Sequence, residues 1–150
     1  MTELKKELYQ YCIDYVEERM GGAQQAINEA QQASNDDTKS SAGDKYETSR
    51  EMMQQETNRN LAQLNEANKL KVILNNISPA SVSDVVEAGS VVITSNGNFY
   101  IAISAGKIMI NNESYVAVSQ ASPIGLRLKG LKQGQEFNLN DKNYLIKKVF

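Results

Sequence analysis

Apolar side chains recur every three or four residues through most of the first half of the chain. This spacing places them on one face of an α-helix, and it occurs in two successive series. The sequence therefore predicts two helices of roughly thirty residues, each about 45 Å long. The first series is Leu4, Leu8, Tyr11, Cys12, Tyr15, Val16, Met20, Ala23, Ile27 and Ala30, and the second is Tyr46, Met53, Leu61, Leu64, Ala67, Lys71 and Leu74.

The segment between the two series, residues 34–43, is rich in Ser, Asn, Asp and Gly and has no apolar rhythm. It predicts a turn, because these residues favour local hydrogen bonds and irregular backbone. Asp44, followed three residues later by Glu47, fits a capping arrangement at the start of the second helix. Two long helices joined by a short loop pair most simply in antiparallel orientation. The sequence thus predicts a slender antiparallel coiled-coil hairpin over residues 1–76, with an acidic tip near residues 35–44.

The second half, residues 77–150, contains both prolines and most of the Val and Ile. Its apolar runs are short and separated by turn signals, which is typical of strands. Ser78-Pro79 ends any continuing helix, and Ser95-Asn96-Gly97 predicts a β-hairpin turn. Ser122 and Pro123 fit the cap and first position of a short helix that ends before Gly130. About five strands and one short helix give an α+β protein with a small β-rich C-terminal domain.

The composition narrows the chemistry that the chain can perform. It contains no His, which excludes imidazole bases and ligands, and its single cysteine, Cys12, lies in the apolar helical series and is interpreted as a buried hydrophobe. Sixteen basic and eighteen acidic residues give a net charge of -2, which argues against binding nucleic acid or membranes through bulk charge. No stretch has transmembrane length, so we expect a soluble, cytoplasmic protein without membrane contact.

Adjacent acids mark the predicted tip. Asp36 and Asp37 lie at the apex, and Asp44 follows beyond the loop. Exposed carboxylates can help to hold magnesium when a partner supplies the remaining ligands, but acids in loops are more often solvated surface or helix caps. A negative tip on a long arm would also be attracted into a positive or metal-containing cavity of a larger partner. Partner binding is therefore favoured over catalysis by the chain alone.

Three segments resemble the Gre family of bacterial transcription elongation factors, the GreA/GreB group. Residues 122–137, SPIGLRLKGLKQGQEF, are similar to the family's Ser-Pro segment, short helix and following strand. Residues 89–92, GSVV, resemble the start of the same domain, and residues 44–51, DKYETSRE, resemble the start of the second helix. Together these matches span nearly the whole chain. Members of this family combine an antiparallel coiled coil with a C-terminal FKBP-like domain.

The resemblance implies binding to RNA polymerase near its secondary channel, through the C-terminal domain and specifically through Ser122, Pro123, Ile124 and Gly125. The coiled coil would enter the channel and act on paused or backtracked complexes, which places the chain among cytoplasmic, DNA-associated transcription proteins with indirect contact to nascent RNA. The chain is not expected to be an enzyme. It has no cofactor of its own, and it would at most stimulate the RNA cleavage activity of the polymerase.

The same resemblance assigns the tip acids a role. Asp36 and Asp37 match the family's tip aspartate, and they would assist catalysis through a magnesium ion shared with the polymerase. The partner acid expected three positions later falls at Lys39 or Ser40, and Asp44 is the candidate substitute. This departure leaves open a non-cleaving regulator or inhibitor of the secondary channel. Two further alternatives are a prolyl isomerase, which the FKBP-like domain suggests, and a coiled-coil adaptor unrelated to transcription.

Overall fold

The computed structural model describes residues 2–37 and 43–150, and the side chains of residues 3–33 and 48–150. The fold is α+β, as predicted. Two long helices, α1 (Thr2–Asp37) and α2 (Gly43–Asn75), precede a six-stranded mixed sheet with one short helix, α3 (Pro123–Leu128). The strands are β1 (Val91–Thr94), β2 (Gly97–Ala102), β3 (Gly106–Ile110), β4 (Glu113–Ser119), β5 (Glu136–Leu139) and β6 (Lys142–Val149).

The chain divides into two compact units. The sheet unit comprises Met1–Tyr15 and Val72–Phe150, and the hairpin unit comprises Val16–Lys71. The long helices thus begin or end in one unit and continue into the other. The sequence predicted two domains that are each continuous in the chain, residues 1–76 and 77–150, and this division stays a prediction.

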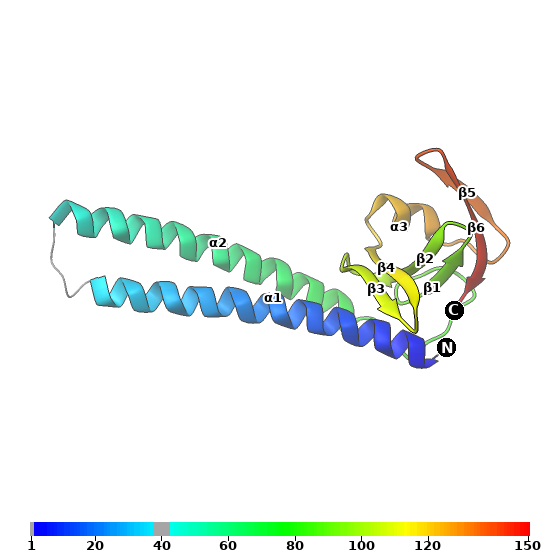
Figure 1. Cartoon of the computed structure of the whole chain (residues 1–150), viewed down its shortest axis with the longest axis horizontal. Coiled ribbons are helices and arrows are strands. Elements are labelled where there is room, and N and C mark those ends of the chain that lie inside the picture. Colours follow the sequence, from blue (N-terminus) through cyan, green and yellow to red (C-terminus); the bar gives the residue numbers. More distant parts are fainter. Residues whose placement is uncertain (1, 38–42) are drawn as a thin grey trace. The chain divides into compact units, whose positions relative to one another are not determined.

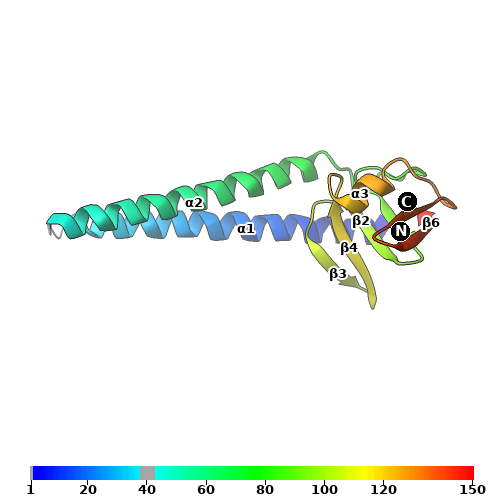
Figure 2. The same ribbon diagram turned by 90° about the horizontal axis from the view of Figure 1, so that it is seen from above.

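In the hairpin unit, α1 and α2 run side by side in opposite directions (Figures 1 and 2). Val16, Ala23 and Ile27 of α1 are buried, as is Ala67 of α2. These positions follow the alternating spacing of three and four residues that keeps one helical face toward a partner helix. The first apolar series is thereby confirmed here at its central positions.

Two residues assigned to the apolar series do not lie in the core. Leu61 is 42% exposed, and the half-buried residue beside it is Asn60. The spacing explains the error, because half-buried Met53, Thr57, Asn60 and Leu64 follow one another at intervals of four, three and four residues. Tyr11, also 42% exposed, lies beside buried Cys12 in the same way. In both cases the regular interval, rather than the more apolar side chain, decides which residue faces inward.

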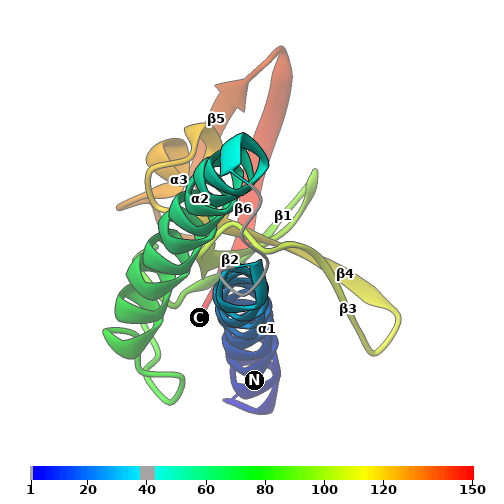
Figure 3. The same ribbon diagram turned by 90° about the vertical axis from the view of Figure 1, so that its left-hand side faces the viewer.

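The sheet has the strand order β3-β4-β2-β1-β6-β5. β2 and β4 are parallel and all other neighbours are antiparallel. The β3–β4 and β5–β6 hairpins extend from opposite edges of the sheet (Figure 3). The structure thus has six strands where the sequence predicted about five.

The turns of these two hairpins follow from their residues. Asn111 and Asn112 have φ of 51° and 66°, and they join Ile110 to its partner Glu113. Asn140 and Asp141 have φ of 53° and 65° and form the equivalent turn between β5 and β6. Two-residue turns of this kind match the right-handed twist of the strands and require positive φ, which Asn and Asp tolerate best among non-glycine residues.

Both faces of the sheet are covered. One face forms an apolar cluster with α3 and neighbouring loops, made of Val86, Val92, Phe99, Ile101, Val118, Leu128 and Ile146. On the other face, the Tyr100 side chain is fully buried and lies close to Tyr9 and Cys12 of α1. Leu8 and Cys12 are themselves fully buried. The first turns of α1 therefore belong to the core of the sheet unit, and Cys12 is a buried hydrophobe as expected.

Candidate functional site

Helix α3 begins with a complete cap. The Ser122 hydroxyl accepts a hydrogen bond from the Gly125 backbone N–H at 3.0 Å and donates one to the Ser119 carbonyl oxygen at 2.7 Å. Pro123 occupies the start of the helix, where its missing N–H costs nothing. At the other end, Gly130 has φ of 80°, a left-handed conformation that suits glycine. The helix predicted around residues 122–129 is therefore present, with the predicted cap and stop.

The four residues predicted to bind a partner differ in their accessibility. Pro123 is exposed, whereas Gly125 is buried. Ser122 is half-buried and its hydroxyl is held by the cap, while Ile124 is half-buried and packs against the apolar cluster. The structure thus brings all four together at the start of α3. It also gives three of them structural tasks, so only Pro123 offers most of its side chain to a partner.

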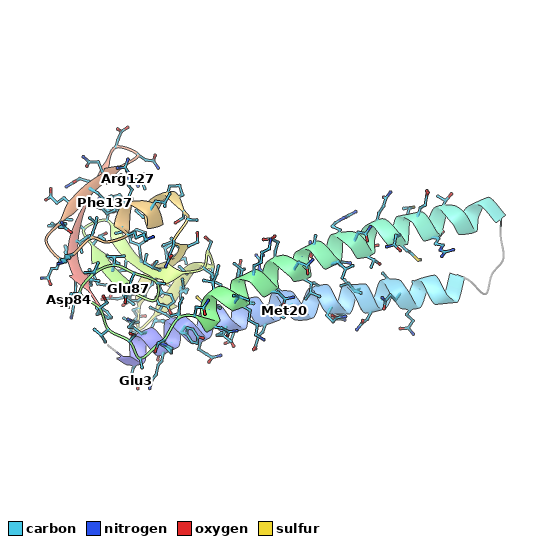
Figure 4. All side chains as sticks on the ribbon, turned by 180° about the vertical axis from the view of Figure 1, so that it is seen from behind. Glu3, Met20, Asp84, Glu87, Arg127 and Phe137 are labelled. Atoms are coloured by element: carbon cyan, nitrogen blue, oxygen red, sulfur yellow. The ribbon has the colours of Figure 1, made fainter. Side chains whose placement is uncertain are left out.

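Leu126 is the accessible apolar side chain of this helix, 64% exposed beside exposed Arg127. Sequence reasoning did not single it out. The signal was available, because Ile124 and Leu128 are four residues apart and share one face of a helix, which turns Leu126 and Arg127 away from that face. Helix α3 and strand β5 contact each other in the sheet unit, and Figure 4 labels one residue of each, Arg127 and Phe137.

Aromatic rings continue this region onto the last hairpin. Phe137 of β5 stacks on Tyr144 of β6, with ring centroids 4.8 Å apart and an interplanar angle of 4°. Tyr144 also makes a tilted contact with Phe99, at 6.1 Å between centroids. These rings are engaged with one another at the edge of the apolar cluster. The arrangement supports a rigid surface beside α3.

The predicted acidic tip lies largely outside the described residues. Asp36 and Asp37 are the last residues of α1, and Asp44 is the second residue of α2, but the side chains of residues 34–47 are not described. Lys39 and Ser40 fall in the undescribed segment 38–42. The magnesium and catalytic roles of the three aspartates therefore stay predictions. Within the described residues, no group of three or more His, Cys, Asp or Glu side chains could hold a metal ion.

The helix ends nevertheless correct one expectation. Residues 34–37 were predicted to belong to the turn, yet they continue α1, and α2 already begins at Gly43. Ser, Asn and Asp disfavour a helix interior by well under about 1 kcal/mol each, so a helix that is already formed can extend through them. Asp44 accordingly lies inside the first turn of α2 and not before it.

Comparisons with known proteins were made for the whole chain. No family model matches the sequence, and no curated protein sequence matches it. Among solved structures, one match is entitled "Structure of the transcription factor Gfh1". It is 19% identical in sequence and covers 94% of this chain and 92% of the other, with a TM-score of 0.35. None of the helices in the described part of the chain combines the length and apolar character that crossing a membrane requires.

Proposed function

We propose that this protein is a bacterial transcription elongation factor that binds RNA polymerase and inserts its helical hairpin into the secondary channel. The observation that carries the proposal is residues 122–137, whose resemblance to the Gre family extends over the cap, helix and strand described above. The capped helix α3 presents Leu126 and Arg127 to solvent. An exposed aliphatic side chain beside a guanidinium suits a protein partner with an apolar depression and an acidic rim.

The hairpin unit has the properties that insertion into a channel requires. It consists of two helices only, and the residues buried in its seam include two alanines, Ala23 and Ala67. Small seam residues add little bulk to the arm, which is only two helices wide. In this proposal Asp36 and Asp37, with Asp44, lie toward the polymerase active centre and assist cleavage of backtracked RNA through a shared magnesium ion. The protein itself is no enzyme and carries no cofactor.

Binding is tested with purified bacterial RNA polymerase and the Leu126→Glu variant. The new carboxylate would lie at the centre of an apolar contact with the polymerase. We expect it to weaken binding by about tenfold or more. Met109→Glu is the matched control, because Met109 is 59% exposed on β3, outside the resembling segment. Leu126 is a cleaner probe than Ile124, whose substitution would also disturb the apolar cluster. Failure of the unmodified protein to bind would favour the adaptor and refute the proposal.

The chemical role is tested on stalled, backtracked elongation complexes with magnesium present. We expect RNA shortening with the unmodified protein, none with the double variant Asp36→Asn, Asp37→Asn, and the same polymerase affinity for both. Equal shortening by both proteins would refute a metal role for these acids. Binding without any shortening would instead identify the non-cleaving regulator, which shares the docking step and lacks the second tip acid at the expected position.

A further inference from the structure

A lysine is buried near the beginning of α1. Lys5 is only 3% exposed, and its Nζ donates a hydrogen bond to the Ser81 carbonyl oxygen at 2.5 Å. Lysine is among the residues that are almost never fully buried without a partner, because removing an ammonium from water is costly. Burial lowers the pKa of Lys5, and the nearby Glu87 carboxylate partly opposes that effect. The fold therefore buries an ammonium group, and other groups must offset the cost of removing it from water.

The protein supplies only part of this compensation. An ammonium group has three N–H donors. Ser81 accepts one, and no other acceptor for Lys5 Nζ is found among the residues that the structure describes. Glu87 is close enough to influence the lysine, yet the two side chains form no ion pair in this part of the chain. Two N–H donors of Lys5 and the Glu87 carboxylate thus lie near each other without direct contact.

A cleft of about 420 Å³ lies at this position, entirely within the sheet unit. Its size is in the range of pockets that hold small molecules. Three parts of the chain form it: the first turns of α1, the connection from α2 to β1, on which Figure 4 labels Glu87, and the turn after β4. Polar groups dominate the lining, which comprises Lys5, Asn76, Ile77, Ser78, Ser81, Glu87, Ala88, Ser90 and Gln120.

Hydrogen bonds hold the backbone turn that carries Glu87 in the cleft wall. Ser90 is 1% exposed, and its hydroxyl accepts a hydrogen bond from the Glu87 backbone N–H at 3.0 Å. The Ser90 N–H in turn donates to the Glu87 carbonyl oxygen at 3.0 Å. These two bonds fix the turn that carries the Glu87 carboxylate. The hydrogen-bonded Lys5 Nζ and the held backbone of Glu87 thus bring two opposite charges to the lining of one cleft.

We propose that this cleft binds a zwitterionic α-amino acid, whose carboxylate accepts from Lys5 Nζ and whose ammonium group donates to the Glu87 carboxylate. A simple anion would gain one contact and be repelled by Glu87, and a simple cation would be repelled by Lys5. A molecule with both charges gains two charge-assisted hydrogen bonds in one site. The surrounding serine, asparagine and glutamine side chains favour a small or polar amino-acid side chain.

The test uses glycine as the probe, with acetate and methylammonium as ligands that carry one charge each. Backbone amide signals of the full-length protein are followed by NMR during titration with each compound. We expect saturable shifts at Ser81, Glu87, Ser90 and Gln120 with glycine, and binding of acetate and of methylammonium that is weaker by about tenfold or more, because each lacks one charge-assisted contact.

Two variants test the separate contributions of Lys5 and Glu87 to glycine binding. Lys5→Met keeps the length of the side chain and removes its charge, and it is expected to abolish glycine binding. Glu87→Gln is expected to reduce glycine affinity to that of acetate. Lys6→Met is the matched control at the neighbouring exposed position and should bind like the unmodified protein. Shifts with glycine that do not saturate, that persist in Lys5→Met, or that acetate reproduces with equal affinity would overturn the proposal. The polymerase-binding assay is independent of all these outcomes.

Discussion

The sheet unit and the hairpin unit are stabilised in different ways. The sheet unit has a continuous apolar cluster of large side chains between its sheet and α3, and a second buried face against the first turns of α1. The hairpin unit buries a single line of residues, and a groove of about 690 Å³ remains beside Ala62, Ala67 and Leu70. Small seam residues leave this space unfilled. The comparison shows that tertiary packing specifies the sheet unit far more strongly than it specifies the hairpin.

Local contacts contribute correspondingly more to the hairpin. On its surface, Gln24 donates to Asn28, Gln25 to Glu29 and Gln54 to Asn58, each at 3.1 Å and four residues apart. An exposed ion pair joins Lys69 and Glu66 at 3.0 Å. Such pairs stabilise a helix by about 0.2–0.5 kcal/mol each. Many small local interactions, rather than a core of large side chains, therefore maintain the arm.

The largest expected effect is that of Gly125→Ala in the sheet unit. A Cβ atom at this position would overlap the Ser119 carbonyl oxygen and would lie 2.9 Å from the Ser122 Oγ atom. With this Cβ atom present, either the turn after β4 or the cap of α3 must change its conformation. We expect a loss of about 3 kcal/mol or more in the free energy of unfolding, as for other overpacked core sites. Urea unfolding followed by near-ultraviolet circular dichroism measures it.

The matched control makes the same chemical change in the hairpin unit. A Cβ added at Gly22 of α1 has no neighbour within 4 Å. Gly22→Ala should therefore stabilise the protein by up to about 1 kcal/mol, because alanine has the better helix propensity. Near-ultraviolet signals report chiefly on the sheet unit, since six of the seven tyrosines, at positions 9, 11, 15, 100, 115 and 144, lie in it. Far-ultraviolet circular dichroism, which reports on the helices of the hairpin unit, therefore measures the effect of Gly22→Ala. Equal effects of the two substitutions would contradict the contrast between the units.

This contrast also explains how much of the fold the sequence predicted. The sheet unit was predicted well because its elements have local chemical causes, such as the Asn96-Gly97 turn between β1 and β2 or the Ser122 cap. The seam of the hairpin was predicted less well, because the choice between Asn60 and Leu61 depends on the register of two helices along their length. Hydrophobicity alone favours Leu61. The contribution of α1 to the sheet-unit core is a long-range contact that periodicity cannot reveal.

In the candidate site too, features with a local motif were predicted, whereas contacts between distant parts of the chain were not. The segment at residues 122–125 was found by its motif, and its cap was predicted from Ser122 and Pro123. That Gly125 is buried against the carbonyl oxygen of Ser119 depends on the turn after β4, and no local pattern encodes it. The buried Lys5 lies 76 residues from its acceptor Ser81, so only the folded chain brings the two together.

A second prediction concerns the pH dependence of the sheet unit. Burial raises the pKa of the Cys12 thiol from 9.0 to about 12. The folded state therefore holds the proton more tightly than the unfolded state, so the contribution of Cys12 to stability is complete below pH 9 and is lost between pH 9 and about 12. The expected slope is about 1.4 kcal/mol per pH unit within this window.

The measurement compares urea unfolding of the unmodified protein and of Cys12→Ala from neutral to alkaline pH, under reducing conditions. The alanine variant loses packing at every pH, but the difference between the two proteins should shrink as the pH rises above 9. Lys5, whose pKa shift does not involve Cys12, is common to both proteins and cancels in the difference. Cys12 contributes to the raised pKa of Tyr100, so the difference also includes the coupling between these two groups. A difference that is independent of pH would show that Cys12 does not titrate in this way.

A smaller effect than that of Gly125→Ala is expected in the hairpin seam, where a polar side chain interrupts the apolar line. The Asn60 Nδ2 atom is buried, and it has no hydrogen-bond partner among the residues that the structure describes. A buried donor without a partner costs about 1–3 kcal/mol, so Asn60→Leu should raise the free energy of unfolding by about 1 kcal/mol or more. Asn65→Leu is the matched control at an exposed position of the same helix, because it makes the same change in helix propensity without burial.

Far-ultraviolet circular dichroism during urea unfolding measures both asparagine variants, because the hairpin unit is almost entirely helical. Subtracting the effect of Asn65→Leu isolates the contribution of the seam, and a difference of zero would mean that water reaches the Asn60 amide. The Asn60→Leu variant also distinguishes the stability of the isolated arm from its ability to bind a partner. If the polar position keeps the arm adaptable inside a partner, Asn60→Leu should bind RNA polymerase more weakly while the isolated protein becomes more stable, since a stiffer hairpin conforms less readily to a channel.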